Sequence, residues 1–317
     1  MSRFLVTGGA GFIGSNFLSR MVENYPDDYF VCLDSLTYAG NRNNLSSVRQ
    51  KPNFSFVKGD ITDRGLVFPL FERERFDYVV NFAAETHVDR SIENPSLFFQ
   101  TNVLGTATLL DASLAYGVRR FHQISTDEVY GDLPLDSKEK FTEKSPLYPS
   151  SPYAASKASA DLIVLAYHRT YSLPVTISRS SNNYGPNQYP EKLIPLAVEK
   201  AQKGEDIPLY GNGKNIRDWI HVFDHGRAID RIIRNGKDGE VYNIGGHNEL
   251  DNLSIVRKIL SFFPHSPSKI TFTKDRKGHD LRYALDTEKI RQDLHFSPEI
   301  PFDQGLKETV LSLLRKE

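Results

Sequence analysis

The stretch ISTDEVYG, residues 124–131, places a hydroxyl and two carboxyl groups side by side at the end of an apolar run. The three residues are Thr126, Asp127 and Glu128. Adjacent carboxylates repel each other and are hard to desolvate, and these two effects can hold one of them as an acid while the other stays a base. The triplet therefore predicts paired proton transfer. The alternative is that Thr126 and Asp127 cap a turn before Gly131, with Glu128 in solvent.

A second reactive pair stands in PYAASK, where Tyr153 and Lys157 are four residues apart at the start of a predicted helix. At that spacing both side chains lie on one face. An ammonium group lowers the pKa of a neighbouring phenol, so Tyr153 could act as a base near neutral pH. Most Tyr-x-x-x-Lys pairs are ordinary solvated neighbours, and this pair gains weight only beside other site residues.

A glycine-rich loop, TGGAGFIG, places Gly8, Gly11 and Gly14 between a predicted strand and a predicted helix. Small residues there permit a tight turn and close approach to a pyrophosphate, which the helix N-terminus can bind through free N–H groups. Asp34 ends the next strand, where a carboxylate accepts hydrogen bonds from ribose hydroxyls and repels a 2′-phosphate. Each feature is common in isolation. Together, in a strand–helix–strand context, they predict NAD rather than NADP as the cofactor.

The composition limits the classes of function. The 317 residues include 39 Lys and Arg against 40 Asp and Glu, a formal net charge of -1, which gives no reason to expect nucleic acid or a membrane as partner. The N-terminus runs directly into glycines, unlike a signal peptide, and no stretch approaches the roughly 18 apolar residues of a membrane span. Cys32 is the single cysteine. A single cysteine allows no internal disulfide, so we expect a soluble protein of the reducing cytoplasm. We also expect no catalytic metal, because the His and Cys residues lack metal-ligand spacing.

Short apolar runs alternate with helical patterns through the first half of the chain. The predicted strands are residues 3–8, 29–34, 53–60, 76–84, 119–126, 174–180 and, further on, 240–246. The predicted helices are residues 12–24, 66–73, 95–117, 152–172 and 253–263. This alternation implies βαβ units with parallel pairing and right-handed crossovers. The predicted fold class is α/β, a doubly wound parallel sheet of the Rossmann type.

After Ser180 this rhythm breaks. Residues 182–195 and 208–224 are rich in Pro, Gly, Asn and Tyr, and we predict loops that present side chains there. The expected division is an NAD-binding domain over residues 1–180, including about 220–245, and a smaller mixed substrate-binding lobe over 181–317. The chain is expected to cross between the two.

These motifs resemble the extended short-chain dehydrogenase/reductase superfamily, whose members act on nucleotide sugars, and within it the dTDP-glucose 4,6-dehydratases. Simple 4-epimerases of the superfamily are similar around the glycines and the Tyr/Lys pair but lack the Asp–Glu after the threonine. The likeness covers nearly the whole chain, through the segments TGGAGFIGSNF, AAETHVDRSI, TNVLGT, STDEVYGDL, SPYAASKASAD, SNNYGPNQYPEKLIP, YGNGKNIRDWIHVFDH, YNIGGHNE and DRKGHDLRYALD.

The resemblance implies an internal redox reaction, in which a sugar is oxidised at C4, loses water across C5–C6 and is reduced at C6. NAD would stay bound and be regenerated in each turnover. Tyr153 would take the 4-OH proton, with Thr126 and Lys157 supporting the phenolate. Glu128 would remove the C5 proton, and Asp127 would protonate the departing 6-OH. Because adjacent side chains of a strand point to opposite faces, the backbone must leave the extended form at this pair.

The motifs and the resemblance together give two predicted contact sets. The cofactor set is Gly8, Gly11, Phe12, Ile13, Gly14, Asp34, Ser35, Leu36, Thr37, Asp60, Ile61, Ala83, Ala84, Thr101, Tyr153, Lys157 and Asn183. The substrate set is His87, Thr126, Asn182, Lys192, Leu193, Pro208, Leu209, Tyr210, Arg217, Asn252, Asp275, Arg276, Gly278, His279 and Asp280.

Arg217 suits a diphosphate because its planar fork can bind two oxygens. The alternative is a surface arginine paired with Asp218. The chain departs from the family pattern at two positions. Lys277 replaces an expected proline in DRKGHD, which loosens that loop and adds a charge, and His221 stands where tyrosine is also familiar.

Two helices carry more apolar residues than one buried face requires. Residues 162–166 are apolar in succession, and the predicted helix 95–117 has a similar excess. We expect a homodimer in which these two helices of each subunit form a four-helix bundle, as the resemblance also implies. The alternative is that the C-terminal lobe covers them.

The predicted function is conversion of dTDP-glucose to its 4-keto-6-deoxy product. The alternatives are a nucleotide-sugar 4-epimerase, a 4,6-dehydratase for another nucleotide sugar, and a cofactor-sensing module without catalysis. A module of that last kind would lack the Tyr, the Lys or an acid, and none is missing. The sequence leaves open the choice between thymidine and uridine and the deoxysugar pathway served.

Overall fold

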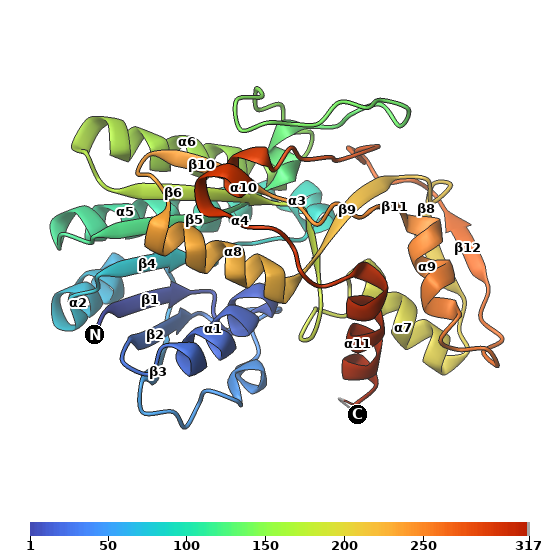
Figure 1. Cartoon of the computed structure of the whole chain (residues 1–317), viewed down its shortest axis with the longest axis horizontal. Coiled ribbons are helices and arrows are strands. Elements are labelled where there is room, and N and C mark those ends of the chain that lie inside the picture. The colour runs from blue at the N-terminus through green and yellow to red at the C-terminus, as the bar shows by residue number, and fades with distance from the viewer. Residues whose placement is uncertain (316–317) are drawn as a thin grey trace.

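A seven-stranded parallel sheet forms the larger part of the computed structural model, which describes residues 1–315 (Figure 1). The strand order is β10-β6-β5-β4-β1-β2-β3. From β1 the chain adds strands toward one edge of the sheet, and from β4 it adds them toward the other edge, which confirms the predicted doubly wound sheet. The strands are β1 (Arg3–Thr7), β2 (Tyr29–Asp34), β3 (Phe54–Lys58), β4 (Tyr78–Asn81), β5 (Arg120–Thr126), β6 (Val175–Ser180) and β10 (Glu240–Ile244).

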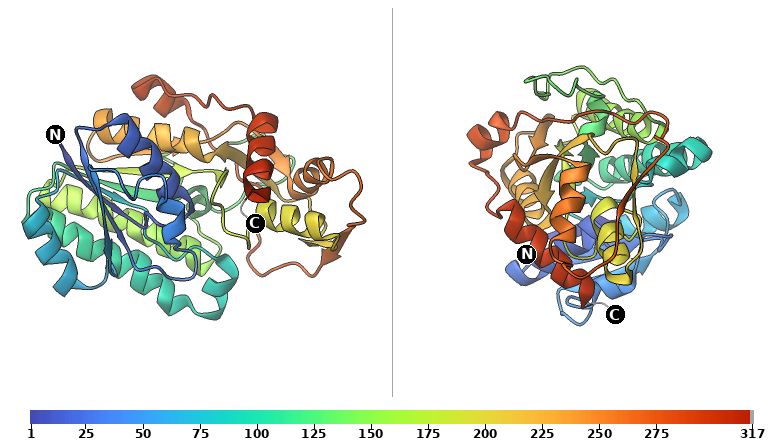
Figure 2. Two further views of the ribbon diagram at one scale, coloured as in Figure 1. Left: turned by 90° about the horizontal axis from the view of Figure 1, so that it is seen from below. Right: turned by 90° about the vertical axis from the view of Figure 1, so that its right-hand side faces the viewer.

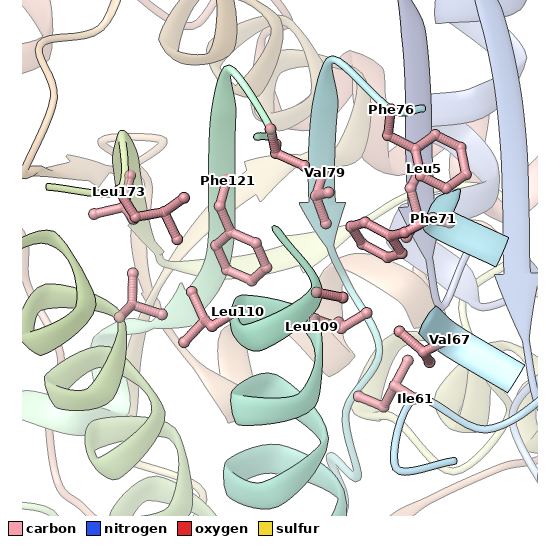
Figure 3. Packing of buried hydrophobic residues seen from close by; sticks show 14 of the residues in the cluster. Leu5, Ile61, Val67, Phe71, Phe76, Val79, Leu109, Leu110, Phe121 and Leu173 are labelled. Atoms are coloured by element: carbon pink, nitrogen blue, oxygen red, sulfur yellow. The ribbon is translucent and has the colours of Figure 1, made fainter. Parts of the chain in front are cut away.

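Helices cover both faces of this sheet, because its strands carry apolar residues on both sides. In β1, Leu5 packs into one cluster of buried residues, whereas Phe4 and Val6 belong to another. The Leu5 cluster lies under the helices α2 (Arg64–Glu74), α5 (Thr106–Ala115) and α6 (Pro152–Tyr171), as Figure 3 shows in part. The other cluster lies under α1 (Phe12–Asn24) and α8 (Val222–Asn235).

The predicted helix 95–117 is interrupted in the middle. It consists of α4 (Pro95–Phe99), a π-helical turn η2 (Gln100–Gly105) and α5. The wide turn contains the buried Asn102, whose side chain accepts from the N–H of Glu85 at 2.8 Å and donates to its carbonyl at 3.0 Å. It also donates to the Ser156 hydroxyl at 2.8 Å. The segment after β4 is thereby tied to α6.

A second group of elements lies beside the carboxyl edge of the sheet (Figures 1 and 2). It contains a three-stranded sheet of order β11-β9-β7 and a two-stranded sheet of β12 and β8. Its elements are β7 (Asn182–Tyr184), α7 (Leu193–Lys203), β8 (Ile207–Tyr210), β9 (Ile216–His221), β11 (Glu249–Asp251), α9 (Asn252–Leu260), β12 (Ile270–Thr273) and α11 (Phe302–Leu314). Because β10 belongs to the large sheet, the chain returns to that sheet between β9 and β11.

The loops predicted for residues 182–195 and 208–224 were partly wrong, because β7, β9 and most of β8 lie there. These short strands form through distant partners. β8 pairs with β12, where Ile207 lies opposite Ile270, so the local residues carry little signal of a strand.

The remaining short elements are η1 (Arg42–Leu45), α3 (Val88–Glu93), η3 (Asp127–Tyr130) and α10 (Glu288–Leu294). Across the described residues, every helix is too short or too polar to cross a bilayer.

Candidate active site

A cleft of about 960 Å³ lies between the carboxyl ends of the large sheet's strands and the second group of elements. The predicted cofactor residues that line it are Gly8, Gly11, Phe12, Ile13, Gly14, Asp34, Ser35, Thr37, Asp60, Ile61, Ala83, Ala84, Thr101, Tyr153, Lys157 and Asn183. The predicted substrate residues that line it are His87, Thr126, Asn182, Lys192, Leu193, Pro208, Leu209, Tyr210, Arg217, Asn252, Arg276 and His279. Asp127 and Glu128 line the same cleft.

Leu36 and Asp275 are predicted contact residues that lie outside this lining. Leu36 has a φ of 56°, and its N–H donates to Asp34 Oδ1 at 2.8 Å. Asp275 is exposed and is hydrogen-bonded to His279 Nδ1 at 2.6 Å. Both residues support a neighbour that does face the cleft.

Gly278 and Asp280 also lie outside the lining. Gly278, with a φ of 61°, turns the loop that carries the exposed Lys277. Asp280 is buried, and its carboxylate accepts from Ser150 Oγ at 2.6 and 2.7 Å and from the hydroxyl of Tyr283. Asp280 therefore anchors the end of this loop instead of pointing into the cleft.

The glycine loop can pack closely against the segment after β4 only because Gly8 lacks a side chain. Gly8 has a φ of 66°, and a Cβ there would lie 2.6 Å from the backbone nitrogen of Ala83. Gly11, the N-cap of α1, makes no side-chain hydrogen bond to the first turn, which leaves those N–H groups available to an anion. Asp34 accepts from the Ala10 N–H at 2.9 Å, and burial raises the pKa of its carboxyl group. The loop thus fits a pyrophosphate, and Asp34 lies where a ribose would follow.

The acid–base pair lies where β5 ends in the 3₁₀ turn η3, so the backbone leaves the extended form as the pair requires. Thr126 caps this turn, because its hydroxyl accepts from the Glu128 N–H at 3.2 Å and donates to Asp127 Oδ1 at 3.2 Å. The capping alternative is thus correct for Thr126. It does not place the carboxyl groups in solvent, since Asp127 is 2% exposed and Glu128 is half-buried.

Tyr153 and Lys157 come from the first turns of α6. Ser151 caps this helix by accepting from the Ala154 N–H at 3.1 Å, and proline follows at the first helical position. Both site residues are buried, and Lys157 Nζ donates to the carbonyl of Ile124 in β5 at 2.5 Å. This bond joins the helix to the strand that carries Thr126.

Burial dominates the electrostatics of the two carboxyl groups. It raises the pKa of Asp127 well above its usual value, and the neighbouring charge of Glu128 raises that pKa further. Burial also raises the pKa of Glu128, while Arg276 and Arg217 lower it. The surroundings therefore favour a protonated Asp127, whereas the two arginines favour ionisation of Glu128 against the effect of its burial.

The phenol and the ammonium are shifted toward their neutral forms. Burial, and then the charge of Glu128, raise the pKa of Tyr153 well above its usual value, although the nearby Thr126 hydroxyl lowers it. The net shift of the Tyr153 pKa is thus opposite to the predicted lowering, and Lys157 is not among the groups that contribute most to it. Burial lowers the pKa of Lys157 itself to about 8, against the opposing charge of Asp161.

Several polar atoms in the cleft have no protein partner. Asp127 Oδ2, Ser181 Oγ and Gln188 Oε1 are buried and make no hydrogen bond within the described part of the chain. Such atoms are costly unless a ligand or solvent satisfies them. They lie beside the acid–base pair and the segment after β6, which supports a polar ligand there.

Positive charge gathers at the second side of the cleft, from Lys192, Arg217 and Arg276. The guanidinium of Arg217 lies over the Tyr283 ring, 4.3 Å from its centroid, and Nη2 donates to the carbonyl of Asp280 at 2.9 Å. The alternative pairing with Asp218 does not occur, because Asp218 accepts from the N–H of Gly246 at 2.8 Å and faces away from Arg217 along the strand.

The prediction from sequence missed Glu85 and Glu191, which line the cleft. Glu85 is 6% exposed, and burial raises its pKa. Glu191 Oε2 lies 3.5 Å from His87 Nε2. The sequence did contain a signal for Glu85, which is the single acidic residue in a segment of small residues after β4. The sequence contained no signal that Glu191 belongs to the site.

Comparison with known proteins places this geometry in a family. The family model described as GDP-mannose 4,6 dehydratase matches residues 5–309. The dTDP-glucose 4,6-dehydratase of Haemophilus influenzae is 47% identical, over 98% of this chain and 97% of that protein. The chain belongs to the dTDP-glucose 4,6-dehydratase family. It also belongs, with that family, to the extended short-chain dehydrogenases/reductases, as the sequence motifs predicted.

Two further proteins are similar to this chain over nearly their whole length. The low-salt glycan biosynthesis protein Agl12 of Haloferax volcanii is 52% identical, over 96% of each chain. The crystal structure of the dTDP-glucose 4,6-dehydratase DesIV from Streptomyces venezuelae, with NAD and TYD bound, has a TM-score of 0.95 and 49% identity. That match covers 99% of this chain and 97% of the other.

Proposed function

We propose that the protein is an NAD-dependent lyase that converts dTDP-glucose to dTDP-4-keto-6-deoxyglucose and water. The observation that carries this proposal is the meeting of Asp127 and Glu128 with Tyr153 in one cleft. Removing a proton from one carbon while protonating an oxygen on the next requires an acid and a base on the same ligand. Relatives that carry this name at 47% and 48% identity support the choice of reaction.

The glycine loop and Asp34 are proposed to hold NAD, with Asn183 and Lys157 beside its reactive end. When bound, NAD supplies the hydride acceptor at C4 and the hydride donor at C6, and its cationic ring opposes the raised pKa of Tyr153. Tyr153 takes the 4-OH proton. The hydroxyl of Thr126, which already lowers the pKa of that phenol, stabilises the phenolate.

The dehydration is assigned to the carboxyl pair. Glu128 takes the C5 proton, the electrons of that C–H bond form the C5–C6 double bond, and the C6–O bond breaks. Asp127 gives its proton to the departing oxygen, which leaves as water. The pKa directions suit these roles, because burial and then the charge of Glu128 keep Asp127 protonated, whereas Arg276 and Arg217 oppose the burial that raises the pKa of Glu128.

The diphosphate is assigned to Arg217, Arg276 and Lys192. These cations line the side of the cleft that also includes Asn252 and Tyr210, where the nucleoside would lie. The description of the matching family model, GDP-mannose 4,6 dehydratase, supports a second candidate, which is the same reaction on another nucleotide sugar.

Turnover in deuterated water tests this function. We expect dTDP-glucose to lose one water by mass and to gain deuterium at C5, faster than UDP-glucose or GDP-mannose does. A 4-epimerase would give neither change. Glu128→Gln is expected to lower turnover by at least about 100-fold, whereas Glu72→Gln, on the exposed side of α2, should leave it unchanged. Unchanged turnover in Glu128→Gln would contradict the mechanism.

The proposed assembly is a homodimer through α5 and α6 of each subunit, joined as a four-helix bundle. Both helices expose large apolar side chains, with Leu162 at 59%, Leu114 at 39% and, in the adjoining π turn, Leu104 at 60%. The second group of elements leaves these residues uncovered. Exposed large apolar side chains gathered on neighbouring helices are typical of an interface, and the partner we assign to them is a second copy of the chain.

A further inference from the structure

A chain of buried polar side chains runs behind the candidate active site. It joins Asp161 of α6, Arg179 of β6, Tyr130 of η3 and Asn243 of β10, all at most 3% exposed. None of these residues lines the cleft. They nevertheless connect the helix that carries the phenol to the turn that carries the acid–base pair.

The hydrogen bonds of this chain have fixed directions. Arg179 Nε donates to Asp161 Oδ2 at 2.9 Å, and Nη1 donates to the Tyr130 hydroxyl at 3.0 Å. Arginine can only donate, so Tyr130 accepts that bond and donates its own proton to Asn243 Oδ1 at 2.7 Å. Burial raises the pKa of Tyr130 to about 12, so the phenol keeps this proton across the working pH range.

The two ends of the chain lie close in sequence to the reacting groups. Asp161 follows Lys157 by four residues and Tyr153 by eight, so it continues the same face of α6. Tyr130 is the last residue of the turn that begins with Asp127. With Thr126 capping the first end, Tyr130 fixes the second, and Glu128 lies between them.

The ring of Tyr130 is held as firmly as its hydroxyl. It stacks on Phe141 with centroids 5.1 Å apart and an interplanar angle of 15°. Asn243 Nδ2 donates to the carbonyls of Phe141 at 2.9 Å and Asp286 at 3.2 Å, which fixes the orientation of the amide. Tyr130 therefore has one position that satisfies all of its partners.

We propose that Tyr130 is a positioning residue for the dehydration step. Its hydroxyl, held between Arg179 and Asn243, fixes the turn so that Asp127 and Glu128 face the same hexose as Tyr153. A buried ion pair stabilises a protein no better than apolar side chains of similar shape. The Arg179–Asp161 pair is better explained by the orientation it imposes on Tyr130. This inference rests on the proposed function.

Tyr130→Phe removes only the hydroxyl, and single-turnover experiments can separate the two chemical steps. We expect water loss, followed by mass, to slow by about 10- to 100-fold, because a small displacement of a catalytic group has effects on this order. Oxidation at C4 should keep its rate within about 2-fold, since the bond from Lys157 to the Ile124 carbonyl still holds α6 to β5. Reduced cofactor should then accumulate, which its absorbance reports, and which a general loss of stability would not cause.

Tyr242→Phe is the matched control. It also removes a hydroxyl from a fully buried tyrosine of β10, one that accepts from the Lys237 N–H at 3.0 Å and, as the strand neighbour of Asn243, points to the other face of the sheet. It should not cause reduced cofactor to accumulate. Asn243→Ala, which removes the acceptor of the Tyr130 proton, is expected to reproduce the effect of Tyr130→Phe.

Three results decide the matter. Accumulation of reduced cofactor in Tyr130→Phe and Asn243→Ala, but not in Tyr242→Phe, supports the inference. If Tyr130→Phe slows C4 oxidation and water loss equally, or slows neither, the positioning role of Tyr130 is overturned, although the proposed function of the wild-type protein is not. Failure of the wild-type protein to release water from any sugar nucleotide overturns the proposed function instead.

Discussion

The carboxyl group of Asp127 lies in surroundings that disfavour its ionised form. Asp127 is 2% exposed, its Oδ2 has no partner within the described residues, and its neighbour Glu128 is also a carboxylic acid. Its pKa is raised, first by burial and then by that neighbour. An arrangement of this kind lowers stability and favours acid catalysis, which is typical of active sites.

Replacing Asp127 by Asn should therefore stabilise the fold while it abolishes dehydration. A carboxyl group with a raised folded-state pKa contributes stability below its unfolded pKa of about 4, and that contribution is lost as the pH rises through the folded pKa. The amide cannot ionise, so the advantage of Asp127→Asn should be small at low pH and grow with pH. We expect on the order of 1 kcal/mol in the free energy of unfolding at neutral pH.

Chemical denaturation at several pH values measures this effect. Asp136→Asn, in an exposed loop, is the matched control and should show no such pH-dependent gain. A variant at Asp127 that is less stable than the wild type at high pH would contradict the argument.

Two elements bring the reacting groups together, and each depends on a cap. β5 ends at Thr126, whose hydroxyl begins the η3 turn, and α6 begins after Ser151, whose hydroxyl accepts the Ala154 N–H. These local bonds decide where Tyr153 and Asp127 enter the cleft. Side-chain caps are thus part of the positioning of the site, in addition to their contribution to helix stability.

Ser151→Ala should cost about 1 kcal/mol of stability through the lost cap. Asp63→Ala removes the corresponding cap of α2, where Asp63 Oδ1 accepts from the Leu66 N–H at 3.2 Å, and should cost a similar amount. Only the Ser151 variant is expected to lower turnover, because only α6 carries Tyr153 and Lys157. Denaturation curves and initial rates of both variants, compared at a temperature where both are folded, check this. Equal effects on turnover would argue against positioning by the cap.

The elements that the sequence predicted correctly are those with strong local patterns. The apolar runs of the large sheet and the Gly8–Gly14 loop were evident because each depends on neighbouring residues. The strands β8 and β9 were missed for two reasons. Their pairing partners lie elsewhere along the chain, and the Pro and Gly residues in and around them are typical of loops. The interruption at Asn102 was missed because its cause is a set of bonds to Glu85 and Ser156.

The predicted site divides in the same way. Most of the predicted residues line the cleft, whereas Leu36, Asp275, Gly278 and Asp280 lie outside the lining and contact or carry residues near it. Tyr130 stands in the same motif as Glu128, but its contacts with Arg179 could not be read from sequence. Such contacts arise from the packing of strands and helices that are remote in the chain.

At the scale of the whole molecule, the cleft exists because the chain leaves the large sheet after β6, returns for β10 and leaves again. The glycine loop and the carboxyl pair come from the first part, and the cations from the second. The division into lobes near residue 180 and the cytoplasmic location stay predictions. The outer side of α5 and α6 exposes Leu114 and Leu162, which makes assembly the remaining question at this scale.

Leu162→Arg should dissociate the proposed homodimer. Leu162 is 59% exposed in the single chain and lies on α6 among other apolar residues, so a two-fold interface would bury two uncompensated charges in the variant. We expect the dissociation constant to rise by at least about 100-fold, and sedimentation at micromolar concentration to show a dimer for the wild type and a monomer for the variant. Leu311→Arg, on α11 at 43% exposure, is the control and should remain dimeric. A monomeric wild-type protein, or a variant Leu162→Arg that remains dimeric, would contradict a homodimer interface through α5 and α6.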